Sequence, residues 1–374
     1  MPLQNAYNAY NAYNAYNAYN AYGVAAATVG GSGGPVLSAA LLRQWEGIGW
    51  AGPGASIEGM PRSAIVTDDD VDTRGGTDDR MFGTAALHRG EAIGFELISG
   101  LVFEEEPDGS EARIRQRVAA GGDAPLLVAL RRPDHEVLDQ GLKAIAGYAE
   151  LREERIPEVE LQITDLLSFF GAILALDGTR HRYTIELALL SIGLSGTLAQ
   201  RMKVSLGVMR PHVLSPHVQP MISTPSHGSY PSGHATQAFA CANVLAAVSG
   251  KRNDDHVRVQ LMRAASRIAI NRTVAGVHYP VDSMAGAILG TAFGEYMEAR
   301  IACAPAPTGR EFAGDGWLAP PNGGEEARDF HFEAFEALEA SNDQTGTPDQ
   351  DGGGTLPAAP LLKALWDRAS EEWP

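Results

Sequence analysis

The strongest constraint on the fold is a series of segments whose apolar residues recur at three- and four-residue spacing. This spacing collects apolar side chains on one face of an α-helix. It is found over residues 81–98, 137–151, 161–176, 183–209, 235–248, 256–270 and 281–303. Helix-breaking residues separate the segments, and the alternation typical of a half-buried strand is nearly absent. The sequence therefore predicts an all-α protein, a helical bundle with short connections.

Two regions of different composition flank this pattern. Residues Asn5–Tyr22 are six tandem copies of Asn-Ala-Tyr followed by a glycine-rich stretch, so we expect residues 1–35 to be a low-complexity, disordered segment. After residue 303 the composition shifts to proline, glycine and acids, and residues 304–374 alone carry a net charge of −10. We expect residues 36–303 to form the helical domain and residues 304–374 an acidic, partly disordered tail with short helices.

Composition excludes several classes of protein. A formal net charge of −17 leaves no basic surplus to neutralise phosphates, which argues against a nucleic-acid binder. Positions 1–22 lack the basic start and apolar run of a secretory signal, and no stretch is apolar enough over ~18 residues for a membrane span. We expect a chain without a membrane span, cytoplasmic or in an unspecified compartment, that acts on a small molecule. The sequence leaves open whether the chain forms a homo-oligomer.

The residues that carry chemistry fall in three blocks between residues 203 and 282. In the first, Lys203 and Arg210 are seven residues apart, so both project from one face of a helix that Pro211 ends. Taken alone, such a pair is more often two surface cations than an anion site. The second block, Pro231-Ser-Gly-His234, precedes a strongly helical run. This places Ser232 and Gly233 at a helix N-terminus, where free N–H groups favour an anion.

The third block contains Arg272, His278 and Asp282. His278 lies just before a helix that Pro280 helps to start, and Asp282 falls in the first turn of that helix. The carboxylate of Asp282 is placed to orient His278 or to pair with a cation, although a plain N-terminal charge has the same spacing. His234 could donate to an anion and transfer its proton. The functional interpretation depends on the three blocks together.

Together the blocks resemble the signature of the superfamily that joins type 2 phosphatidic-acid phosphatases, bacterial acid phosphatases and vanadium-dependent haloperoxidases. That signature is Lys, six residues, Arg-Pro; Pro-Ser-Gly-His; and Ser-Arg, five residues, His, three residues, Asp. The spacings of Lys203–Arg210 and Arg272–His278–Asp282 agree, while Asn271 stands where the family has serine. The resemblance covers about 80 of 374 residues and implies the helical-bundle fold of that superfamily.

The resemblance also implies a role for each residue. Three cations would neutralise the oxygens of a vanadate or phosphate, and Ser232 and Gly233 would hydrogen-bond it; His278 would be the vanadium ligand or the nucleophile, and His234 the acid–base group. Asp282 would support His278. His227, five residues before Ser232, matches a histidine of the family's bromoperoxidases and would tune halide handling or the protonation of His234, although a loop histidine without a role is equally consistent. The cations are Lys203, Arg210 and Arg272.

Two activities follow from this resemblance. The favoured one is a vanadium-dependent haloperoxidase, with vanadate as cofactor and hydrogen peroxide and halide as substrates. The alternative is a soluble acid phosphatase that hydrolyses a phosphate ester through a phosphohistidine and needs no cofactor. The short span between His234 and Arg272 favours the alternative, and the roughly 200 residues before the first block favour the haloperoxidase. A non-enzymatic helical interaction module is the third interpretation.

Overall fold

The computed structural model describes residues 77–252, 254–317, 329–345 and 354–374. The chain divides into two compact units: residues 20–89 form the first, and residues 1–19 with 90–374 form the second. The first is described from Thr77 onward, as α4 (Thr77–Phe82) and the first residues of α5 (Ala86–Ile98). The predicted disordered segment 1–35 lies outside the described residues, as does the beginning of the predicted helical domain.

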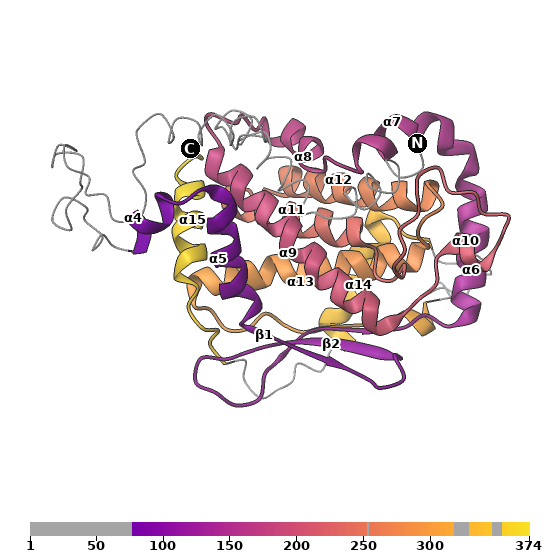
Figure 1. Ribbon diagram of the computed structural model, residues 1–374, viewed down its shortest axis with the longest axis horizontal. Coiled ribbons are helices and arrows are strands. Elements are labelled where there is room, and N and C mark those ends of the chain that lie inside the picture. Colours follow the sequence, from indigo (N-terminus) through magenta and orange to yellow (C-terminus); the bar gives the residue numbers. More distant parts are fainter. Residues whose placement is uncertain (1–76, 253, 318–328, 346–353) are drawn as a thin grey trace, which may run out of the picture. The chain divides into compact units, whose positions relative to one another are not determined.

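The second unit is built around the helix α11 (Figure 1). α11 is rich in alanine, nearly all of its side chains are buried, and it contacts α9, α12 and α13. Gly286, Gly290 and Gly294 recur every four residues on the face of α13 that meets α11. A Cβ at Gly286 would lie 2.5 Å from the carbonyl oxygen of Ser232, so only glycine permits this approach. The close packing holds the start of α13 beside the start of α11.

The predicted predominance of helix is confirmed. The long helices match the periodic segments, although α8 begins six residues after the predicted start and α12 extends four residues beyond the predicted end. The bounds of the helices and 3-10 turns are α6 (His135–Gly147), η2 (Tyr148–Leu151), α7 (Arg152–Leu161), α8 (Leu167–Leu174), α9 (Arg182–Leu206), α10 (Pro211–Leu214), α11 (Gly233–Val248), α12 (Asp255–Val274), α13 (Pro280–Ala302), η3 (Gly314–Gly316), α14 (Phe332–Thr345) and α15 (Pro360–Ser370).

The prediction of an all-α fold is wrong in one respect, because four strands form a small sheet. Its order is β1-β2-β3-β4, antiparallel except for the parallel pair β3–β4. In β2, Ala112, Ile114 and Gln116 are buried and alternate with partly exposed residues. β3 is apolar from Leu126 to Leu130 and packs against α13. The strand bounds are β1 (Leu101–Glu105), β2 (Glu111–Gln116), β3 (Leu126–Arg131) and β4 (Arg310–Ala313).

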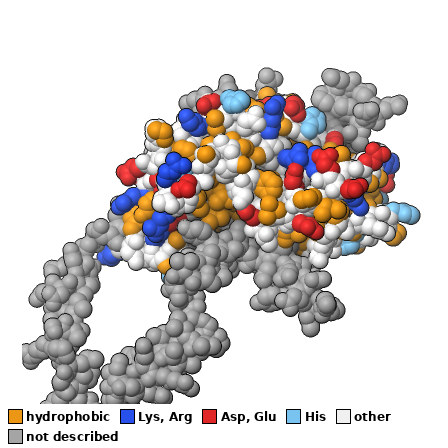
Figure 2. All heavy atoms as spheres, turned by 90° about the horizontal axis from the view of Figure 1, so that it is seen from above, with side chains coloured by type: hydrophobic (Ala, Val, Ile, Leu, Met, Phe, Trp, Pro, Cys, Tyr) orange, Lys and Arg blue, Asp and Glu red, His pale blue; other side chains and the backbone are white. Residues whose placement is uncertain are grey.

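The surface carries charges of both signs. On the face seen in Figure 2, basic and acidic side chains lie interspersed among apolar ones. Some of the surface charges form ion pairs; for example, Nη2 of Arg267 lies 2.5 Å from Oε1 of Glu158. Exposed pairs of this kind contribute only ~0–1 kcal/mol each to stability. Within the described part of the chain, no helix combines the length and the hydropathy needed to cross a membrane.

Candidate active site

The three sequence blocks meet at the N-terminal end of α11. The amide of Ser232 donates to the carbonyl oxygen of Asp282 at 2.8 Å, which joins the second block to the third. Nη1 of Arg210 donates to the carbonyl oxygen of Val277 at 2.7 Å, which joins the first block to the third. Residues 50 and 67 positions apart in the sequence are therefore in contact, and the predicted site residues share one region of the bundle.

Lys203 lies in the last turn of α9 and is only 1% exposed. Its Nζ donates to the carbonyl oxygens of Gly228 at 3.1 Å and Ser229 at 2.6 Å. Burial lowers the pKa of Lys203 well below the usual range of lysine, and the charge of Arg210 lowers it further. A bound anion would oppose both effects and favour the charged ammonium. The buried lysine is thus suited to hold an anion.

The two arginines are buried as well and are held by carbonyl oxygens. Nε of Arg210, the N-cap of α10, donates to the carbonyl of His227 at 3.0 Å. Nη2 of Arg272, in the last turn of α12, donates to the carbonyl of Val159 at 3.1 Å and to Oε1 of Gln162 at 2.8 Å. These contacts fix the guanidinium planes, and a fixed planar donor set suits oxygens of a tetrahedral anion.

The start of α11 adds backbone donors to the three cations. Ser232 caps the helix, and its hydroxyl oxygen accepts from the amide of Ala235 at 3.4 Å. Gly233 and His234 are the first two helical residues, whose amides precede the helix's own ladder of hydrogen bonds. A Cβ at Gly233 would lie 3.9 Å from Cε of Lys203, so the lysine passes close to this helix end. Both the amides and the helix dipole favour negative charge there.

His278 is held with one ring nitrogen committed to a hydrogen bond. Its Nδ1 lies 2.9 Å from Oδ2 of Asp282, which also accepts from the amide of Tyr279 at 3.0 Å. Because a carboxylate accepts, the network assigns the proton to Nδ1 and leaves a lone pair on Nε2 of the neutral ring. Burial lowers the pKa of His278 well below its usual range, followed by the charges of Arg210 and Lys203. The neutral, lone-pair-bearing form is therefore favoured.

His234 is held by the opposite nitrogen. Its Nε2 lies 3.1 Å from the backbone carbonyl oxygen of Gln162, so this network assigns the proton to Nε2. Burial lowers its pKa well below the usual range, and the charge of Arg272 adds to the effect. The charges of Lys203 and Arg210 act in the same direction, which shows that His234 lies in the field of the cationic cluster. Its side chain is half-buried, unlike that of His278.

His227 also lies in this cluster, between two fixed partners. Its Nδ1 is 2.9 Å from the carbonyl oxygen of Gly228, and its Nε2 is 3.0 Å from Nε2 of Gln200. Since the carbonyl accepts, Nδ1 donates and Nε2 accepts from the amide of Gln200. Burial, followed by the charge of Lys203, lowers the pKa of His227 to about 3. The ring is therefore neutral across the physiological range.

Sequence reasoning missed α7 and its C-cap Gln162. Oε1 of Gln162 accepts from both Arg272 and Asn271, at 2.8 and 3.1 Å. Asn271, which stands where the resembled family has serine, is fully buried and also donates to Glu158 of α7 at 2.9 Å. A signal was present in the sequence, because Arg155, Glu158 and Gln162 recur at spacings of three and four on one helix face. This polar face braces the end of α12 that carries Arg272.

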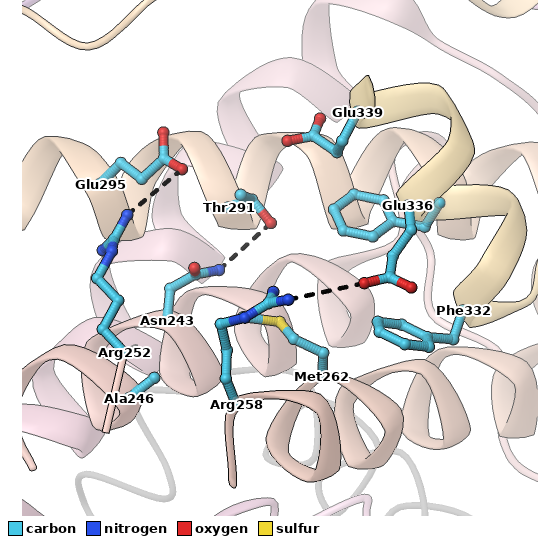
Figure 3. A pocket seen from close by; sticks show the side chains of 11 residues that line it. Asn243, Ala246, Arg252, Arg258, Met262, Thr291, Glu295, Phe332, Glu336 and Glu339 are labelled. Carbon is cyan, nitrogen blue, oxygen red and sulfur yellow. Dashed lines mark hydrogen bonds and ion pairs between the residues drawn. The ribbon is translucent and has the colours of Figure 1, made fainter. Parts of the chain in front are cut away.

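A separate cavity of about 350 Å³ lies between α11, α12, α13 and α14. Figure 3 shows Arg252 directed toward Glu295 and Arg258 toward Glu336, each pair 3.8 Å apart. None of the described residues that line this cavity belongs to the three sequence blocks. Within the described residues, no group of three or more His, Cys, Asp or Glu side chains is arranged to hold a metal ion. The cationic cluster is thus the candidate site.

Comparison with known proteins gives a family for this region. Residues 186–297, which include all three blocks, match the model of the PAP2 superfamily. A vanadium-dependent bromoperoxidase of Ascophyllum nodosum is 32% identical over 91 residues, and the match covers 18% of this chain and 16% of that protein. The similarity therefore spans about a sixth of the bromoperoxidase.

One solved structure is also similar over part of the chain. It is that of a transmembrane PAP2-type phosphatidylglycerolphosphate phosphatase from Bacillus subtilis, at 20% identity. The alignment covers 43% of this chain and 80% of the phosphatase, with a TM-score of 0.27, which is too low to support an argument about fold or function. The family match, with the three blocks that it contains, is therefore to residues 186–297 of this chain, which are similar to the PAP2 superfamily.

Proposed function

We propose that this chain is an enzyme that binds a tetrahedral oxyanion at the start of α11 and that it is a vanadium-dependent haloperoxidase. The observation that carries the proposal is the hydrogen bond from His278 to Asp282 within a cluster of buried cations. It leaves Nε2 of a fixed, neutral imidazole with a lone pair, beside groups that attract an anion. A ring nitrogen of this kind can ligate vanadium or attack phosphorus.

The residues fit vanadate by charge and by donor type. Lys203, Arg210 and Arg272 are each 3% exposed or less, and burial, followed by the charge of Arg210, lowers the pKa of Lys203. A multiply charged anion would offset the cost of burying three like charges, and the cations would need little reorganisation to hold it. The amide of Gly233 and the hydroxyl of Ser232 would donate to further oxygens. Bound vanadate would supply the activation of hydrogen peroxide toward a halide.

The protein's own groups would then serve the reaction in different ways. Nε2 of His278 would ligate the vanadium, and Asp282 would hold the ring in the required tautomer. His234, half-buried and within the field of the cations, would take up and release protons on the substrate side. His227 would shape the halide site as a neutral side chain, because burial keeps its pKa at about 3. The similarity to a bromoperoxidase, 32% identity over 91 residues, supports haloperoxidase chemistry.

A phosphatase is the second candidate, and the geometry of the two histidines favours it. His278 is buried with a free Nε2 lone pair, as a nucleophile toward phosphorus requires. His234 is more exposed; a bound phosphate ester would raise its pKa, and the protonated ring would then give a proton to the leaving alcohol. The bond between phosphorus and the ester oxygen would break as Nε2 bonds to phosphorus, and water would later release phosphate from the phosphohistidine. Phosphate would then be the substrate group, and no cofactor would be needed.

A paired assay on the purified full chain tests the proposal. One arm follows bromination of a phenol dye with peroxide, bromide and added orthovanadate, and the other follows hydrolysis of p-nitrophenyl phosphate without vanadate. We expect vanadate-dependent bromination. Phosphate release that vanadate inhibits would instead establish the phosphatase.

A histidine variant tests the site in the same assay. His278→Ala should lower kcat by about 100-fold or more in whichever arm is active, because it removes the group that bonds to the anion. His217→Ala, an exposed histidine of the loop after α10, is the matched control and should keep wild-type rates. Unchanged turnover of His278→Ala would reject the site.

A further inference from the structure

Gln162 connects two of the proposed site residues, although it lies outside the three sequence blocks. It follows α7 as its C-cap and is only 1% exposed. Oε1 accepts from Nη2 of Arg272 at 2.8 Å, and the backbone carbonyl oxygen accepts from Nε2 of His234 at 3.1 Å. The side chain of Gln162 thus orients the arginine, while its backbone orients the histidine.

The other end of the same amide has an unsatisfied donor. Nε2 of Gln162 is buried, and among the residues that the structure describes no acceptor lies within hydrogen-bonding distance. An exchange of the amide oxygen and nitrogen does not remove this, because Arg272 and Asn271 both donate to the position of Oε1. A buried donor without an acceptor is destabilising, so an acceptor is expected there in the functional state.

We propose that Gln162 is a further ligand of the bound oxyanion, with Nε2 donating to one of its oxygens while Oε1 holds Arg272 in place. The inference rests on the oxyanion-binding function proposed above. Its chemical basis is that a tetrahedral anion is rich in acceptors and that Gln162 already contacts the side chain of Arg272 and the ring of His234. The ligand class is vanadate or phosphate, which present the same oxygens.

Variants can separate this role from the support that α7 gives to the bundle. Gln162→Leu removes both the donor and the acceptor but keeps the backbone carbonyl that holds His234. Gln162→Glu keeps an acceptor for Arg272 and replaces the donor with an oxygen that repels the anion. Gln116→Leu is the matched control, because Gln116 is fully buried in β2, where its Nε2 donates to the carbonyls of Leu126 and Pro307.

The experiment measures dissociation constants of the full chain for inorganic phosphate and for orthovanadate by isothermal titration calorimetry. We expect Gln162→Leu and Gln162→Glu to weaken binding of both anions at least tenfold, with Gln116→Leu within twofold of wild type. The pH profile of turnover should stay unchanged in Gln162→Leu, because the contact to His234 is retained. Circular dichroism reports folding, and if the leucine variant does not fold, the glutamate variant decides.

Two results would overturn the inference while leaving the proposed function intact. One is anion affinity within twofold of wild type in a folded Gln162 variant. The other is a loss of affinity together with a shifted pH profile in Gln162→Leu, which would show that α7 itself has moved. Failure of the wild-type chain to bind either anion would overturn the proposed function and this inference together.

Discussion

At the residue scale, Asp282 determines which nitrogen of His278 is available to a ligand. Asp282→Asn should lower kcat by about 10- to 100-fold, because the amide no longer enforces a proton on Nδ1. The backbone contact from Tyr279 can still be made to the asparagine oxygen, so folding should be retained. Steady-state kinetics with thermal unfolding checks both, and Asp139→Asn, at an exposed position of α6, is the control. Wild-type kcat in Asp282→Asn would show that the tautomer does not matter.

His227 gives a prediction of a different kind, since burial lowers its pKa to about 3 and keeps the ring neutral at working pH. His227→Ala should raise the KM for halide several-fold and change halide preference. The pH profile between about pH 5 and 8 and the oxyanion affinity should stay as in the wild type. Halide-dependent kinetics at several pH values checks this. If the halide KM is unchanged, His227 only supports the loop through Gly228 and Gln200.

The sequence was sufficient to propose Lys203, Ser232 and His278 as site residues, because the spacings within their blocks resemble a family signature. It was not sufficient for Gln162. Pro157 lies inside α7 and the helix has few apolar residues, so no apolar period marks it. What holds α7 in place is a set of polar contacts to residues about 110 positions away, such as Asn271. Their local trace is the polar spacing of Arg155, Glu158 and Gln162, which a search for apolar periods does not detect.

At the scale of elements, the sheet was missed for a related reason. β2 has only one large apolar residue, Ile114, among its alternating positions, and the flanking arginines give it a polar profile. β3 is a short apolar run, which periodicity alone does not distinguish from a piece of helix. Its partner β4 begins at Arg310, about 180 residues later, in the region predicted as an acidic tail. Long-range pairing of this kind has no local signal, whereas helices carry their period within each segment.

Glu372, near the C-terminal end of the chain, caps the start of α9, the helix that carries Lys203. The two carboxylate oxygens of Glu372 accept from the amides of Tyr183 at 2.7 Å and Thr184 at 2.8 Å, at the start of α9. Glu372→Gln should lower the free energy of unfolding by about 1–2 kcal/mol, because it removes a charged cap from a helix N-terminus. Chemical denaturation checks this, with Glu371→Gln, at an exposed position, as the control. Equal stability of the two variants would mean that the charge of Glu372 does not stabilise the start of α9.

At the scale of the whole molecule, we expect the buried cations to link anion binding to proton uptake. The pKa values of Lys203, His234 and His278 are each lowered, first by burial and then by neighbouring positive charge. A bound anion raises each pKa toward its ordinary value, so the complex binds more protons than the free protein at the same pH. The anion affinity should therefore be highest at low pH and should be lost as pH rises through the pKa values of the complex.

Sulfate is a suitable probe of this linkage, because its own charge is constant between about pH 5 and 8. Calorimetric titration in two buffers of different ionisation enthalpy should show net proton uptake on sulfate binding. At a concentration 100 times the dissociation constant, sulfate should stabilise the fold by ~2.7 kcal/mol. Lys203→Met should reduce both the uptake and the affinity, whereas Lys143→Met, at an exposed position of α6, should change neither. Net proton release on sulfate binding would contradict a site whose buried lysine and histidines have lowered pKa values in the free protein.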